Sequence, residues 1–198
     1  MVACTSLICV NGVLTIIVLT FLGQKMLSMT LNVERGIVVK IKKRSRIQEN
    51  KIAKEIEGKP VVGSGCLWGA KGDARNDNYL IEAKFTDLPS YKLAYTTWEK
   101  IRKEAVNDGL RIPVMQITIQ NTEYALLRLE DLGSLAEDKE CVLELLQTNY
   151  ANKSKSIVPY PFDLLGAENP NGIQCVTYKF GDNEALALIW WKDFKYIM

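Results

Sequence analysis

The sequence predicts an α/β or α+β fold in which a central mixed β-sheet is flanked by helices. Segments with strand alternation and segments with helical periodicity follow one another in the order strand, helix, strand, strand, helix, strand, strand. This order is typical of a sheet covered by helices. The chain has 198 residues and 47% hydrophobic content, which is enough to bury one core and a small appendage.

The first two predicted elements of the core lie between residues 35 and 57. In "RGIVVKIKK", residues 35–43, apolar residues alternate as in a half-buried strand. The segment 46–57 is predicted to be a helix, because Ser45 and Gln48 form a capping-box pattern and Gly58 is a typical stop. Its apolar positions are expected to share one face and are Ile47, Ile52, Ala53 and Ile56.

Residues 79–86, "YLIEAKFT", are predicted to form a strand after a turn at residues 76–78. A short strand and a glycine-rich turn precede it and return the chain at Asp73. Because side chains alternate along a strand, Glu82 and Lys84 share one face. The other face is apolar and consists of Tyr79, Ile81, Ala83 and Phe85. The strand therefore places an acid and a lysine side by side.

A second helix is predicted at 96–108, "TTWEKIRKEAVND", with one of its two leading threonines as the cap and Gly109 as the stop. Its inward face is expected to contain Trp98, Ile101 and Ala105, with Val106 as an optional fourth member. The segments 112–119 and 124–132 are then predicted to be two strands, the second ending in a short turn.

Residues 136–198 are predicted to form a β-rich C-terminal extension of a core at 30–135. The extension is expected to include a short helix at 138–151. The segment "YALLRLEDL", 124–132, is similar to "LALIWWKDF", 186–194. This similarity indicates either an internal repeat or two hairpins of the same architecture, and a single pair of segments favours the second interpretation.

The N-terminal segment 1–24 contains no charged residue and is long enough to cross a bilayer. It lacks the cationic start and cleavage site of a signal peptide. Two interpretations remain. The segment is a membrane anchor, with the cations of residues 40–46 keeping the rest of the chain in the cytoplasm, or it is an upstream extension of a cytoplasmic protein whose translation starts at Met26 or Met29.

The composition excludes several kinds of chemistry. The chain has no histidine, which removes the commonest general base and transition-metal ligand. Its five cysteines are odd in number and show no CxxC spacing, so neither a zinc site nor a disulfide framework is expected. Catalysis would therefore depend on carboxylates, lysine, cysteine or tyrosine.

Glu49, Asp73, Glu82 and Lys84 form the candidate site, provided that the fold brings them together. Carboxylate oxygens without nitrogen or sulfur ligands suit a hard cation such as Mg²⁺. Such a cation can polarise a phosphodiester and supply a bound hydroxide. Lys84 would position or deprotonate the attacking water, or offset charge on the phosphate. These residue types point to phosphodiester hydrolysis.

The residues "GD", then eight residues, then "EAK" resemble the motif of the PD-(D/E)XK nuclease superfamily. Over residues 45–132 the chain is similar to small phage and bacterial proteins described as Holliday-junction-resolvase-like endonucleases. The resemblance implies a restriction-endonuclease-like core that cuts DNA, including branched DNA, with Mg²⁺ or with Mn²⁺ in its place. It assigns metal binding to Asp73 and Glu82, the motif lysine to Lys84 and the helix-borne acid to Glu49.

The same resemblance implies a homodimer, because resolving a symmetric junction needs two active sites. Ser64, Trp68 and Lys71 lie in the loop that leads to Asp73 and are expected to contact nucleic acid. Further cations that could extend a basic rim are Lys92, Lys100, Arg102 and Lys103. Glycine replaces the proline of the motif name, and residues 1–24 and 136–198 have no counterpart in minimal resolvases. The alternative is a non-catalytic protein of the same fold that binds nucleic acid, or a membrane-tethered interaction protein.

Overall fold

The computed structural model describes residues 4–10, 13–19, 44–61, 72–160, 162 and 172–198. The chain divides into two compact units, Met1–Lys43 and Arg44–Met198. The strand expected at 35–43 and the loop containing Ser64, Trp68 and Lys71 lie outside the described residues.

In the N-terminal unit the described residues form an antiparallel hairpin. Its strands are β1 (Cys4–Val10) and β2 (Val13–Leu19), and Cys4 lies opposite Leu19. Among the helices of the described residues, none is both long enough and apolar enough to cross a membrane. The segment 1–24, one interpretation of which is a membrane anchor, contains these two strands.

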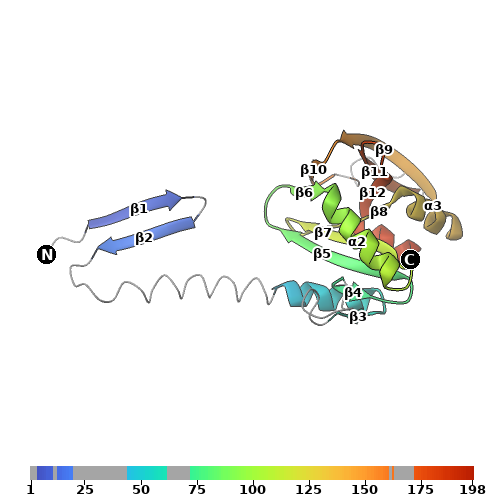
Figure 1. Ribbon diagram of the computed structural model, residues 1–198, viewed down its shortest axis with the longest axis horizontal. Coiled ribbons are helices and arrows are strands. Elements are labelled where there is room, and N and C mark those ends of the chain that lie inside the picture. Colours follow the sequence, from blue (N-terminus) through green and yellow to red (C-terminus); the bar gives the residue numbers. More distant parts are fainter. Residues whose placement is uncertain (1–3, 11–12, 20–43, 62–71, 161, 163–171) are drawn as a thin grey trace. The chain divides into compact units, whose positions relative to one another are not determined.

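The larger unit is built on a mixed sheet of eight described strands in the order β3, β4, β5, β7, β8, β12, β11, β9 (Figure 1). β5 runs parallel to β7 and β9 runs parallel to β11, whereas the other neighbours are antiparallel. The strands are β3 (Lys59–Pro60), β4 (Ala74–Arg75), β5 (Tyr79–Thr86), β7 (Ile112–Ile119), β8 (Thr122–Arg128), β12 (Ala185–Trp190), β11 (Gly172–Phe180) and β9 (Val142–Ala151). The predicted mixed sheet is confirmed, and the C-terminal residues complete it.

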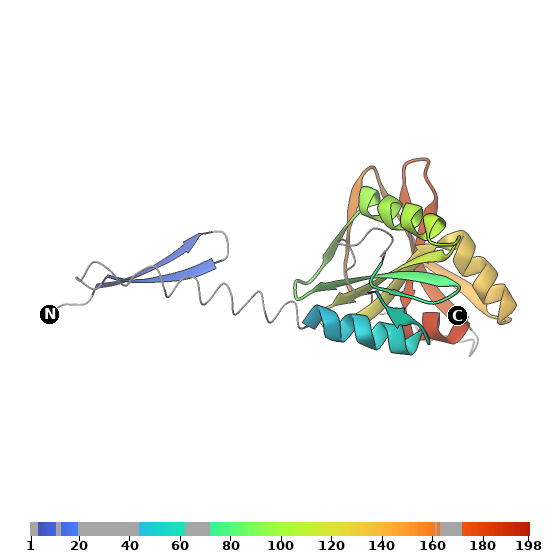
Figure 2. The same cartoon turned by 60° about the horizontal axis from the view of Figure 1, so that its bottom comes forward.

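Helices and a small ribbon pack on this sheet (Figure 2). One core joins the sheet to a helix that includes residues 44–55, to α3 (Leu129–Asp138) and to α4 (Trp191–Ile197). A second core joins the sheet to α2 (Tyr95–Asn107) and to an antiparallel ribbon of β6 (Tyr91–Ala94) and β10 (Ser154–Ile157). Alternate residues of β8 enter the two cores, so the cores lie on opposite faces.

The two similar sequence segments form two similar structural units. β7 and β8 make a hairpin followed directly by α3, and β11 and β12 make a hairpin followed directly by α4. Leu126 of β8 lies opposite Leu188 of the antiparallel neighbour β12. The same two leucines are equivalent in the alignment of 124–132 with 186–194, so a local two-fold axis relates the units at this pair. The structure therefore favours an internal repeat.

The similarity extends to the preceding strands of each half. β5 lies parallel to β7, and β9 lies parallel to β11 at the corresponding position. The next strands along the chain are β6 and β10, which pair with each other antiparallel. The pairing brings residues 91–94 of the first half directly beside residues 154–157 of the second half.

The predicted strands 79–86 and 112–119 coincide with β5 and β7. The second predicted helix is confirmed as α2, with Trp98, Ile101 and Ala105 buried. Its expected threonine cap is wrong, because the cap is Ala94 and makes no side-chain cap bond. The N–H of Tyr95 instead donates to the carbonyl of Lys153, so the ribbon satisfies the first turn.

Two predicted packing positions on the helices are also wrong. Val106 is 50% exposed on α2, and Ile47 is 60% exposed on the 44–55 helix. The other three apolar residues of the 44–55 helix, Ile52, Ala53 and Ile56, are buried as expected. Ile47 precedes this group, and its sequence neighbours Arg46 and Gln48 are polar.

The first predicted helix is confirmed, but its expected start and stop signals work differently. Ser45 is already helical and its hydroxyl donates to Glu49, so the capping box does not form. The left-handed residue that ends the helix is Glu57, with φ of 52°. Gly58 follows it, and a Cβ on Gly58 would lie 2.4 Å from the carbonyl oxygen of Arg75. Gly58 is thus required for close approach to β4, not for its dihedral angle.

Secondary structure after residue 128 differs most from the prediction. The expected turn at the end of 124–132 is the start of α3, which buries Leu132 and Ala136 one helical turn apart. The helix expected at 138–151 is wrong, because these residues form the strand β9. β9 pairs with β11 and places Leu143 against one core and Leu146 against the other. Pairing at the sheet edge overrides the local helical preference of this segment.

Candidate site at the β4 and β5 strands

Glu82 and Lys84 lie side by side on β5, as the strand alternation predicts. The Lys84 ammonium donates a hydrogen bond to Glu82 Oε1 at 2.5 Å. The side chains are 20% and 29% exposed for Glu82 and Lys84, respectively, so the pair is largely shielded but accessible from one side. Tyr79 and Ile81, which alternate with them, are buried in the core with the 44–55 helix.

Asp73 is brought next to this pair by the short β4 strand. Ala74 lies opposite Ile81 in the antiparallel β4–β5 register, so Asp73, one residue earlier, lies beside Glu82. The backbone N–H of Asp73 donates to the Ile81 carbonyl at 2.8 Å. Its carboxylate Oδ2 accepts the N–H of Ala83, also at 2.8 Å. The Asp73 side chain thereby extends the ladder just before β4 begins.

The backbone at residue 72, directly before Asp73, requires glycine. Its φ is +67°, which L side chains rarely adopt, and a Cβ there would lie 2.8 Å from Leu80 Cδ1. The chain needs a residue without a side chain at this point to turn Asp73 toward β5.

The electrostatic environment of Asp73 is unfavourable for a carboxylate. Burial, and next the charge of Glu82, raise the pKa of Asp73 from 3.8 to about 6, although the hydrogen bond from Ala83 opposes the rise. The charge of Glu49 raises it further. Neighbouring carboxylates that repel one another in a shielded position are typical of functional sites.

Lys84 responds in the opposite way to the same neighbours. Burial lowers the pKa of Lys84, but the hydrogen bond and charge of Glu82 and the charge of Asp73 outweigh burial, and the pKa rises. Lys84 is therefore protonated at neutral pH. This charge state favours a role in stabilising negative charge over one in abstracting a proton from water.

Glu49 lies at the margin of the site. It projects from the 44–55 helix, and its carboxylate accepts the Ser45 hydroxyl at 2.9 Å. Its charge acts on Asp73, but no set of three or more acidic or cysteine side chains within the described residues is close enough to form a metal-binding group. The structure thus brings Asp73, Glu82 and Lys84 together and places Glu49 nearby.

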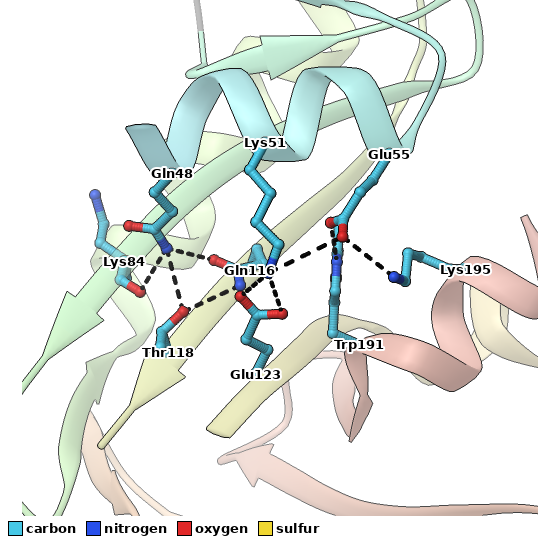
Figure 3. Close-up of polar contacts among 9 residues, drawn as sticks. All are labelled: Gln48, Lys51, Glu55, Lys84, Gln116, Thr118, Glu123, Trp191 and Lys195. Atoms are coloured by element: carbon cyan, nitrogen blue, oxygen red, sulfur yellow. Dashed lines mark hydrogen bonds and ion pairs between the residues drawn. The ribbon is translucent and has the colours of Figure 1, made fainter. Parts of the chain in front are cut away.

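Glu55, another acid of this helix, serves the fold. Its carboxylate accepts the indole N–H of Trp191 at 2.8 Å and the ammonium of Lys195 at 3.2 Å (Figure 3). Both partners belong to α4. Glu55 therefore ties the 44–55 helix to α4 and is not available to the site.

The polar contacts of Gln48 were not expected from the sequence. Gln48 donates to Gln116 Oε1 at 2.6 Å and lies 3.3 Å from Thr118 Oγ1 and 3.5 Å from the carbonyl oxygen of Lys84 (Figure 3). Gln116 is fully buried and Thr118 is 7% exposed. Gln48 thus joins the helix of Glu49 to the strand of Lys84. Two polar residues at alternate positions of an apolar strand, 116 and 118, are the sequence signal for such a contact.

Comparison of the chain with protein-family models, with curated protein sequences and with solved structures finds no match. Its function is therefore inferred from the geometry of its own residues.

Proposed function

We propose that the protein is a metal-dependent endodeoxyribonuclease that hydrolyses phosphodiester bonds. The observation that carries this proposal is the convergence of Asp73, Glu82 and Lys84 at the β4–β5 pair. The element order gives further support. A helix is followed by the antiparallel strands β3, β4 and β5, then by the short strand β6, by α2 and by β7 parallel to β5. Apart from β6, this order agrees with the restriction-endonuclease-like core that the motif implies.

The donor set suits a hard divalent cation such as Mg²⁺, with Mn²⁺ as a substitute. Asp73 and Glu82 would hold it, because a cation between them would remove the repulsion that raises the pKa of Asp73. When bound, the cation would polarise the phosphodiester and supply a bound hydroxide. Glu49 would assist through water, because its charge raises the pKa of Asp73 less than the charge of Glu82 does.

The chain's own residues contribute position and charge. Asp73 is fixed beside Glu82 by its hydrogen bond from the N–H of Ala83. Lys84 is held by Glu82 and keeps its proton. Its ammonium would face the charge that develops on the phosphate oxygens during the reaction.

The test is a cleavage assay on a panel of four-way junctions, flaps, duplexes and single strands, with Mg²⁺ and with Mn²⁺. We expect Glu82→Ala and Lys84→Ala each to lower the cleavage rate by at least about 10²-fold while DNA binding is mostly kept. Glu99→Ala and Lys103→Ala are matched controls, since Glu99 and Lys103 form an acid–lysine pair on α2 at 2.8 Å. If the wild-type protein cuts none of these substrates with either cation, endonuclease activity is excluded.

The same panel distinguishes branched from ordinary DNA as the substrate. Paired cuts in a symmetric junction require two sites, so a junction resolvase would be a homodimer, whereas a nickase could act as a monomer. Light scattering of the protein alone and with junction DNA measures the oligomeric state directly.

A non-catalytic nucleic-acid-binding protein of the same fold is the second candidate. The observation in its favour is that the site residues also have structural partners: Asp73 extends the sheet ladder and Glu82 is paired with Lys84. Binding without cleavage, at equal affinity in the Glu82→Ala variant, would support this candidate.

A further inference from the structure

The cations of the larger unit fall into two groups, those with acidic partners and those without. On α2, Lys100, Arg102 and Lys103 each form an ion pair, with Glu104, Glu184 and Glu99, respectively. These helix residues were candidates for a basic rim, and the structure shows that their charges are offset. Lys92, the remaining candidate, has no ion pair among the described residues and lies on β6.

Two further lysines are brought beside Lys92 from the second half of the chain. In the β6–β10 ribbon Lys92 lies opposite Ser156 on one face, and Lys155 lies opposite the buried Leu93 on the other face. Lys153 immediately precedes β10, and its carbonyl accepts the N–H of Tyr95. Neither Lys153 nor Lys155 forms an ion pair within the described part of the chain. The ribbon thus brings Lys92 close to Lys153 and Lys155, which follow it by about sixty residues in the sequence.

The two chain segments that form the ribbon contain no acidic residue of their own. The segments 88–98 and 145–160, which contain the ribbon, include Lys92, Lys153 and Lys155 and no aspartate or glutamate. Lys92 and Lys153 are exposed, and Lys155 is half-buried. The ribbon core is apolar, with Leu93 and Ile157 fully buried, so the fold holds the lysines on a rigid base.

The ribbon also borders the candidate site. β6 follows β5 in the chain, and its first residue, Tyr91, is close enough to Lys84 and Glu82 for their charges to act on its hydroxyl. A polyanion lying on the ribbon would therefore pass beside the Glu82–Lys84 pair.

We propose that the β6–β10 ribbon binds the phosphate backbone of DNA through Lys92, Lys153 and Lys155. The choice of DNA over another polyanion rests on the proposed function, whereas the location of the surface rests on the ion-pair pattern alone. Lysines contact phosphates as point charges without reading the sequence. The serines at 154 and 156 add hydroxyl donors of the kind that also contact phosphate oxygens.

The test is DNA binding by fluorescence anisotropy in EDTA, with the full chain, a short duplex and a series of salt concentrations. Each phosphate contact adds about 0.9 to the slope of log K against log salt for duplex DNA. We expect the triple variant Lys92→Gln, Lys153→Gln, Lys155→Gln to lower this slope by about 2 to 3. Lys100→Gln with Lys103→Gln, which changes paired lysines, should leave it within about 1 of the wild-type value.

The outcomes separate this inference from the proposed function, because no cleavage is needed. An unchanged slope in the triple variant, or no binding of duplex or single-stranded DNA by the wild-type protein, would overturn the inference. Binding confined to vesicles of phosphatidylcholine and phosphatidylserine would also overturn it and assign the ribbon to a membrane surface. If the triple variant lowers the slope but the wild-type protein cuts no DNA, the ribbon is a DNA-binding surface and endonuclease activity is excluded. Replacement of the same lysines by arginine should restore binding if charge is the cause.

Discussion

The carboxylate of Asp73 accepts a hydrogen bond from the backbone N–H of Ala83 at 2.8 Å, so a side chain extends the β4–β5 ladder just before β4 begins. This bond fixes Asp73 beside Glu82, in a position where burial and a neighbouring charge disfavour its ionised form. A group held at such a cost reduces the stability of the folded chain and is a common feature of functional sites.

Replacement of Asp73 by asparagine is expected to stabilise the protein at pH 8. The folded-state pKa of Asp73, about 6, exceeds its ordinary value of 3.8, so the folded state binds the proton more tightly. Its contribution to stability is therefore lost as pH rises from about 4 to about 6. At pH 8 the difference amounts to at most about 3 kcal/mol, and asparagine can still accept the Ala83 N–H.

Urea unfolding of the wild-type protein and the Asp73→Asn variant at pH 4 and pH 8 measures this effect. The gain should be present at pH 8 and small at pH 4, where Asp73 is mostly protonated. Asp77→Asn, at an exposed turn position, is the control and should change little at either pH. If the Asp73→Asn variant is less stable than the wild type at pH 8, the ionised Asp73 carboxylate does not destabilise the folded protein.

Divalent cations are expected to stabilise the wild-type protein through the same two carboxylates. A ligand at 100 times its Kd adds about 2.7 kcal/mol to the free energy of unfolding. The rise in melting temperature with added Mg²⁺ at pH 8 should be reduced in Glu82→Gln and absent in Asp73→Asn. Glu99→Gln, on α2, should keep the full rise. An equal rise in all four proteins would place the cation elsewhere.

Gly72 is expected to tolerate no side chain. Alanine at this position would adopt a φ of +67° and place its Cβ 2.8 Å from Leu80 Cδ1 and 3.1 Å from the Ile81 carbonyl oxygen. Gly72→Ala should therefore destabilise the protein by about 1–3 kcal/mol. Gly133→Ala is the matched control, because Gly133 lies in α3 with nothing within 4 Å of its Cβ position. It should stabilise the protein by up to about 1 kcal/mol. Equal effects of the two substitutions would contradict the close packing at Gly72.

The strands that carry the site could be predicted because their information is local. β5 and β7 alternate apolar and polar residues over their last five positions, and the alternation also fixes which face Glu82 and Lys84 share. The position of Asp73 beside β5 is set by the register of the two-residue strand β4. The turn residues before Tyr79 indicate that the chain reverses there, so this pairing could be predicted.

The features that could not be predicted depend on contacts between distant segments. The rotation of the 44–55 helix, which places Gln48 on the sheet and Glu49 at the margin of the site, is set by Gln116 and Thr118 of β7. β9 is a strand because β11 offers it a partner, although its leucines and its glutamate favour a helix locally. The ribbon brings Lys92 close to lysines that follow it by more than fifty residues in the chain.

Removal of the Gln48 amide is expected to destabilise the protein and displace Glu49. In Gln48→Leu the buried Gln116 and Thr118 would lose the partner that joins them to the helix, at a cost of about 1–3 kcal/mol. Lys51→Ala is the matched control on the same helix, since it breaks the Lys51–Glu123 ion pair at 2.7 Å but leaves half-exposed groups that water can solvate. Its cost should be about 0–1 kcal/mol. Because the pairing of Gln48 with β7 also sets where Glu49 stands, Gln48→Leu should weaken Mg²⁺-dependent stabilisation, whereas Lys51→Ala should not. If both variants lose stability equally and keep the same Mg²⁺ response, the Gln48 contact is one of many packing contacts and does not position the site.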